Sequence, residues 1–202
     1  MTKIGIILGS IRRNSLGQHI FEYLQKSEPN TAQFEFTWID LKDYPLDFYE
    51  HRQTPLSETI TDLKANESAW LDTLKAQDGY IIISPEYDHA IPGSLKNALD
   101  YVGPEVEGKP VQIITYSSFS DGGMLAAESM VEILQMLKMI VLPTPVLLWD
   151  ANNNFNEDGL IVDAENSDHF QARLQEAFND IAFYTKTLAE APYQKYIHAN
   201  LD

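Results

Sequence analysis

Five short apolar runs typical of β-strands alternate with longer stretches of helical periodicity, and this alternation constrains the fold more than any other feature of the chain. The apolar runs cover residues 4–8, 34–39, 80–83, 111–116 and 145–148, and the helical stretches cover residues 15–27, 57–76, 92–102, 122–139 and 165–190. Repeated strand–helix units predict a parallel sheet with helices on both faces. We therefore expect an α/β fold, a three-layer α/β/α sandwich around a doubly wound, five-stranded parallel sheet.

The composition of each run predicts its place in that sheet. Four runs are continuous rather than alternating, as expected of strands covered on both faces, whereas residues 34–38 alternate and suit an edge. This favours the strand order 2-1-3-4-5. With 202 residues, 44% of them hydrophobic, the chain is long enough for one well-buried domain, so we expect a single domain over residues 1–202.

Charge and cysteine content exclude several classes of function. A formal net charge of −16 argues against binding to nucleic acid or to an anionic membrane surface. No apolar run is long enough for a membrane helix and no signal region opens the chain, which predicts a cytoplasmic protein. Without cysteine, any redox chemistry must come from a bound cofactor. The five histidines lack metal-ligand spacing, and we predict no metal site.

The loop after the first apolar run has the residues of an anion site. It reads GSIRRNS over residues 9–15 and leads into a helix, whose free N–H groups and dipole favour a phosphate. Ser10, Asn14 and Ser15 can donate to phosphate oxygens, and Arg12 can bind them through two N–H groups. The loop is neither a Walker A loop nor GxGxxG. The alternative is that Ser15 only caps the helix, Asn14 lies in a turn and the arginines are solvated.

Two further polar loops follow the third and fourth apolar runs and should meet the first at one edge of the sheet. In the first of them, backbone groups can bind the edge of a flat heterocycle while Tyr87 lies near its face. The glycines of the other permit close backbone approach. The alternative for both is an ordinary turn before an amphipathic helix. Their candidate site residues are Pro85, Glu86, Tyr87 and Asp88, and Ser117, Asp121, Gly122 and Gly123.

Together these loops resemble the NADPH-dependent FMN reductase family, which includes flavodoxin-like quinone, azo-dye and chromate reductases. That family carries GSxRxxS after strand one, PEYNxxxPGxLKNAxD after strand three and a GG-containing loop after strand four. The chain reads GSIRRNS at 9–15, PEYDHAIPGSLKNALD at 85–100 and SSFSDGG at 117–123, in the same order. The resemblance spans residues 3–148, and the first two motifs are the more specific.

The resemblance implies a flavodoxin-like fold, an FMN cofactor and electron transfer from NADPH or NADH to a small acceptor. It implies that the first loop holds the phosphate, the second lines the isoalloxazine ring and the third closes the far side. FMN supplies the chemistry, so no catalytic side chain is expected. A homodimer or homotetramer is also implied. The expected FMN-binding residues are Ser10, Arg12, Asn14, Ser15, Leu16, Gly17, Pro85, Glu86, Tyr87, Asp88, Ser117, Asp121, Gly122 and Gly123.

Two residues depart from the family pattern. Asp88 replaces the usual Asn, and an ionised carboxylate there should disfavour anionic reduced flavin and lower its potential. Gly17 stands where many relatives have Asn, which removes one side-chain contact to the phosphate or ribityl region.

Two other functions compete with the reductase. A flavodoxin-type electron carrier suits the acidic surface, although typical flavodoxins lack the PEYxxxxPGxLKN motif. A fold relative without flavin, serving as a scaffold, is disfavoured by the intact phosphate loop. The irregular aromatic stretch 43–59 is a candidate lid or dimer contact, and the segment after Pro192, which we expect to follow the last helix, is a second candidate contact.

Overall fold

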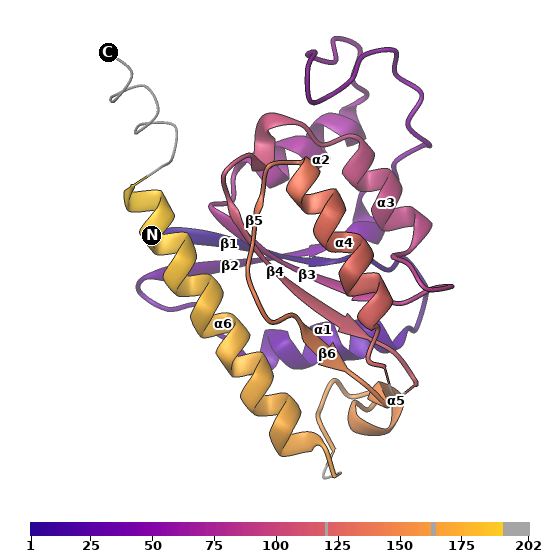
Figure 1. Ribbon diagram of the computed structural model, residues 1–202, viewed down its shortest axis with the longest axis vertical. Helices are drawn as coiled ribbons and strands as arrows, with labels where there is room; N and C mark the ends of the chain where they lie inside the picture. The colour runs from indigo at the N-terminus through magenta and orange to yellow at the C-terminus, as the bar shows by residue number, and fades with distance from the viewer. Residues whose placement is uncertain (120, 163–164, 192–202) are drawn as a thin grey trace.

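The computed structural model describes residues 1–119, 121–162 and 165–191, and its centre is a parallel sheet in the predicted order (Figure 1). The order is β2-β1-β3-β4-β5, and β6 also pairs with β4. The strands are β1 (Thr2–Leu8), β2 (Phe34–Asp40), β3 (Gly79–Pro85), β4 (Pro110–Tyr116), β5 (Ile140–Val141) and β6 (Val146–Leu148).

The burial of the strands follows their places in the sheet. Every residue of β3 and β4 is buried, as their continuous apolar runs predict, because helices cover both of their faces. Among the described strands, β2 pairs only with β1 and is only partly buried, which confirms its predicted edge position.

The fifth position of the sheet is filled by two short strands rather than one. The prediction for residues 145–148 matches β6 but missed β5, which pairs with the first residues of β4. Between the two, Thr144 adopts a positive φ of 57°, a conformation that interrupts an extended strand.

Helices form the two outer layers (Figure 1). Buried side chains of α1 (Leu16–Ser27), α5 (Ala151–Asn154) and α6 (Ser167–Glu190) form one core against the sheet. Buried side chains of α2 (Ala65–Lys75), α3 (Gly93–Asp100) and α4 (Met124–Met136) form the other, and short 3-10 turns occupy Leu41–Asp43 and Pro104–Val106. Among the described residues, no helix is both long and apolar enough to cross a membrane.

The helix predicted over residues 57–76 is wrong for its first turns, since α2 begins only at Ala65. The Glu67 side chain accepts a hydrogen bond from the Lys64 N–H at 2.8 Å, and this capping contact sets the start of the helix. Ser57 does not cap a helix: its N–H instead donates to the Thr54 carbonyl at 2.9 Å in a local turn.

The irregular stretch before α2 is held against α3 by side chain–backbone hydrogen bonds. The Asn97 amide accepts from the Tyr49 N–H at 3.0 Å and donates to the Asp47 carbonyl at 2.8 Å. The Tyr101 hydroxyl lies 3.0 Å from the same carbonyl oxygen. These contacts fix the stretch without regular structure. Pro192 and the segment after it lie outside the described residues.

Candidate functional site

The three polar loops follow neighbouring strands and emerge at one edge of the sheet. Leu8 at the end of β1 pairs with Ile83 of β3, and Pro85 at the end of β3 pairs with Tyr116 at the end of β4. The carboxyl ends of parallel strands next to a switch in strand order are the usual ligand sites of such sheets. The fold therefore brings together the loops that the sequence singles out.

Side-chain contacts join the first loop to the second. The Ser10 hydroxyl lies 3.3 Å from the Tyr87 hydroxyl and is 2% exposed. The Arg12 guanidinium lies over the Tyr87 ring, 5.7 Å from its centroid. Within the described part of the chain, no carboxylate forms an ion pair with Arg12. An exposed guanidinium without an anionic partner, in a chain with net charge −16, is free to bind an anion.

The first loop ends in a capped helix. Ser15 is the N-cap of α1, and its hydroxyl accepts from the Gln18 N–H at 3.3 Å. Asn14, before it, adopts a left-handed φ of 46°. Ser15 therefore caps the helix and Asn14 lies in a turn, as the alternative to a phosphate contact predicts for these two side chains. The N–H groups of Leu16 and Gly17 lie in the first turn of α1, where no helix carbonyl can accept them, so they still favour an anion.

The second loop closes on itself in a tight turn. The Tyr87 N–H donates to the Ala90 carbonyl at 2.9 Å, and the Ala90 N–H donates back at 3.0 Å. Asp88 and His89 at the tip both have positive φ, 49° and 64°. This is the backbone pattern of a type I′ turn, in which Asn, Asp and Gly are preferred. Position 88 therefore needs a residue such as Asp or Asn for conformational reasons as well as for any contact with a ligand.

Glu86 connects the second loop to the third. Its carboxylate, 9% exposed, accepts hydrogen bonds from the N–H groups of Leu125 at 3.0 Å and Ala126 at 3.1 Å, in the first turn of α4. Its own N–H donates to the Tyr116 carbonyl at 3.3 Å. The Glu86 side chain thus caps α4 and fixes the two loops relative to each other.

Hydrogen bonds within the third loop shape the approach to α4. The Asp121 carboxylate accepts from the Gly123 N–H at 3.2 Å, a contact that lowers the pKa of Asp121. Gly122 and Gly123 have φ of 62° and 82°, which disfavour any residue with a β-carbon. The Ser117 hydroxyl accepts from the Phe119 N–H at 2.8 Å.

One residue of the site was missed from the sequence. Tyr116, the last residue of β4, is 4% exposed, and its hydroxyl lies against Gly17 of α1. Burial raises the pKa of Tyr116, while hydrogen bonding with Ser10 and the charge of Arg12 act to lower it. The only signal in the sequence is a tyrosine at the end of an otherwise apolar strand.

A groove of about 670 Å³ opens beside the first loop. Its size is within the range of small-molecule sites. Its lining is mostly apolar, with two cationic side chains. The lining residues are Ile11, Arg13, Leu41, Lys42, Tyr44, Pro45, Leu46, Phe48, Gly93, Ser94 and Asn97.

Comparison with known proteins shows which family the chain resembles. The family described as NADPH-dependent FMN reductase matches residues 2–154. An NAD(P)H-dependent FMN reductase of Schizosaccharomyces pombe is 30% identical over 142 residues, which cover 70% of this chain and 70% of that protein. A quinone reductase of Escherichia coli K12 is 27% identical over 176 residues, 83% of this chain and 89% of that protein.

A solved structure has the same fold. It is the flavoenzyme NAD(P)H:(acceptor) oxidoreductase FerB of Paracoccus denitrificans, which aligns with a TM-score of 0.71 and 22% identity over 93% of this chain and 98% of its own. The match over residues 2–154 includes all three loops of the site. The chain therefore belongs to the NADPH-dependent FMN reductase family.

Proposed function

We propose that this protein is an FMN-containing oxidoreductase that takes electrons from NADPH or NADH and passes them to a small acceptor: a flavin, a quinone, an azo compound or a metal oxyanion. The observation that carries the proposal is the exposed Arg12 guanidinium beside the first turn of α1, which forms no ion pair among the described residues of a chain with net charge −16. The family assignment supports the same function. It does not support the alternative of an electron carrier.

The residues present fit FMN. Ser10, Arg12 and the first-turn N–H groups of α1 offer donors of the kind a phosphate needs. The backbone of the Tyr87–Ala90 turn and the aromatic ring of Tyr87 suit a flat heterocycle. Gly122 and Gly123 give the third loop a positive-φ backbone, and β-carbons at these positions would crowd Leu147 of β6 and Thr115 of β4.

When bound, FMN would supply the redox chemistry, which is hydride transfer from the nicotinamide and electron transfer to the acceptor. The tasks of the chain are binding and orientation. Arg12 neutralises the phosphate, the Tyr87–Ala90 turn presents backbone groups to the ring edge, and Glu86 keeps the second and third loops in register through its contacts with α4.

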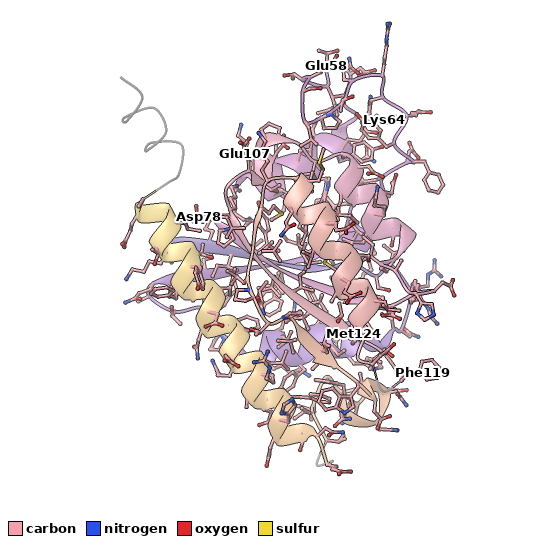
Figure 2. All side chains as sticks on the ribbon, in the orientation of Figure 1. Glu58, Lys64, Asp78, Glu107, Phe119 and Met124 are labelled. Atoms are coloured by element: carbon pink, nitrogen blue, oxygen red, sulfur yellow. The ribbon has the colours of Figure 1, made fainter. Side chains whose placement is uncertain are left out.

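We assign the groove beside Ile11 and Arg13 to the nicotinamide or the acceptor, because it adjoins the phosphate loop. We also propose that the protein is a single cytoplasmic domain that assembles into a homodimer or homotetramer. Exposed apolar side chains near the site support this assembly: Phe48 is 86% exposed, and Phe119 and Met124, both labelled in Figure 2, are 78% and 46% exposed. Light scattering of the purified protein measures the number of subunits.

The function is tested by anaerobic absorbance spectroscopy. The purified protein is incubated with FMN, desalted and divided between two cuvettes, which receive NADPH or NADH. We expect visible flavin absorption to survive desalting and to bleach promptly with at least one of the two donors. Flavin that stays oxidised until dithionite is added would support the electron carrier, and a protein that retains no flavin would contradict both functions.

A further inference from the structure

The buried hydroxyl of Tyr116 occupies the space that a side chain at position 17 would need. A β-carbon built on Gly17 would lie 2.8 Å from Cζ of Tyr116 and closer still to its hydroxyl oxygen. Separations below 3.0 Å are not tolerated between such atoms, so Gly17 can be replaced only if Tyr116 moves. Tyr116 is held in place because β4 is a central strand and the residue pairs with Pro85 on one side and Leu148 on the other.

The surroundings of this hydroxyl are those of the anion site. The Tyr116 hydroxyl hydrogen-bonds with the Ser10 hydroxyl, and the positive charge of Arg12 acts on it. Gly17, against which it lies, is in the first turn of α1, where N–H groups have no helix acceptor. A buried phenol hydroxyl needs a hydrogen-bond partner, and here its partner Ser10 and the nearby charge of Arg12 are the two side chains that the proposed phosphate site uses.

We propose that the Tyr116 hydroxyl binds the FMN phosphate, taking the place of a polar side chain at position 17. Its donor reaches the first turn of α1 from β4, whereas the donors of Ser10 and Arg12 come from the loop itself. Gly17 is required because only a residue without a β-carbon leaves room for the phenol. The Tyr116 hydroxyl, from β4, thereby replaces the contact that an Asn side chain at position 17 of α1 would make. This inference rests on the proposed phosphate site.

The first test compares FMN with riboflavin, which lacks the phosphate, by fluorescence titration of the flavin-free protein. Tyr116→Phe keeps the ring and removes only the hydroxyl. We expect it to weaken FMN binding about tenfold, as for loss of one hydrogen bond to a charged group, and to leave riboflavin binding unchanged. Tyr80→Phe is the matched control, because it also removes a buried tyrosine hydroxyl. Tyr80 lies near the start of β3, away from the loops of the site, and its hydroxyl donates to the Leu74 carbonyl at 2.6 Å.

A second test measures the coupling between positions 17 and 116. Gly17→Ala should weaken FMN binding in the native background, because the new β-carbon displaces the phenol. In a Tyr116→Ser background the same substitution should change FMN binding by less than about twofold, since the phenol atoms are gone and Cδ1 of Leu8, at 3.1 Å, has only to shift slightly. Thermal melting of each variant verifies that it is folded.

The outcomes separate this inference from the function on which it rests. If the native protein binds FMN no better than riboflavin, the phosphate site itself is wrong. If the native protein prefers FMN but Tyr116→Phe shows the same preference, the phosphate site stands and the role of Tyr116 is refuted. Equal effects of Gly17→Ala in both backgrounds would refute the dependence of Gly17 on Tyr116.

Discussion

Nε2 of His51, in the irregular stretch before α2, lies 3.0 Å from Oε2 of the buried carboxylate of Glu67. The same carboxylate group also accepts from the Lys64 N–H at 2.8 Å and the Tyr101 hydroxyl at 3.1 Å. Burial alone would raise the pKa of Glu67, but these hydrogen bonds outweigh it and leave the pKa below its ordinary value of 4.5. One carboxylate thus connects the irregular stretch, the start of α2 and the end of α3.

This arrangement predicts an acid-sensitive contribution to stability. A carboxyl group with a lowered pKa stabilises the native state above its ordinary pKa of 4.5, and the stabilisation disappears as the pH falls through the folded-state pKa. Glu67→Gln should cost about 2 kcal/mol at neutral pH through weaker hydrogen bonds. The difference between the variant and the native protein should shrink in acid, as measured by urea unfolding at pH 7 and at pH 3. Glu58→Gln, in the exposed part of the stretch, should show neither effect.

Arg12→Ala should release FMN readily. Loss of a charge-assisted contact worth about 1.5 to 3 kcal/mol corresponds to a Kd higher by roughly 10- to 100-fold. The measurement is titration of the flavin-free protein with FMN at two salt concentrations, and the loss should be larger at low salt. Arg13→Ala is the control, because Arg13 lines the neighbouring groove, and should change the Kd by less than about twofold. An unchanged Kd for Arg12→Ala would remove the phosphate from this loop.

Three glycines separate the costs of backbone conformation and crowding. Gly122 combines a φ of +62° with a β-carbon position 2.9 Å from Leu147, whereas Gly108 has a φ of +73° and no atom within 4 Å. Gly93 is crowded by nothing and has an ordinary φ. Gly108→Ala should lower the free energy of unfolding by about 1 kcal/mol and Gly122→Ala by at least about 2 kcal/mol. Gly93→Ala should leave it unchanged or raise it slightly. Thermal melting gives the order, and equal melting temperatures for the first two variants would contradict it.

Asp88→Asn should raise the reduction potential of bound FMN. Asn keeps the left-handed conformation of the turn and removes a negative charge beside the ring that the second loop is proposed to line. For an exposed charge worth about 1 kcal/mol, the shift in a two-electron couple is about 20 mV. Equilibration with a reference dye measures it. Glu132→Gln, an exposed carboxylate on α4, should leave the potential unchanged, and a shift of the same size in that variant would show that only overall charge matters.

The sheet could be predicted because the residue pattern of each strand reflects how that strand is buried. A strand covered on both faces is mostly apolar without alternation, as β3 and β4 are, and an edge strand such as β2 alternates. The order of the strands then places the three loops at one edge, so the candidate site could be located without coordinates.

The rest depended on contacts between residues far apart in the chain. Residues 57–64 have a helical pattern, but His51 binds Asp62 at 3.0 Å and the Glu67 cap starts the helix later. The role of Glu86 as a cap for α4 rests on a contact 39 residues away. The contact between Gly17 and Tyr116 joins α1 to β4, and several other elements separate the two in the sequence. Local patterns contain no information about such pairs.

The turn from Tyr87 to Ala90 has a consequence for how a ligand arrives. Two residues with positive φ are held there by reciprocal backbone hydrogen bonds, so the conformational entropy of the turn is lost when the chain folds. A ring that docks against it meets a rigid surface and need not order a loop. The flavin-free protein should therefore behave as a preformed receptor, with association limited by encounter and with little change in amide exchange at this turn when the ligand is bound.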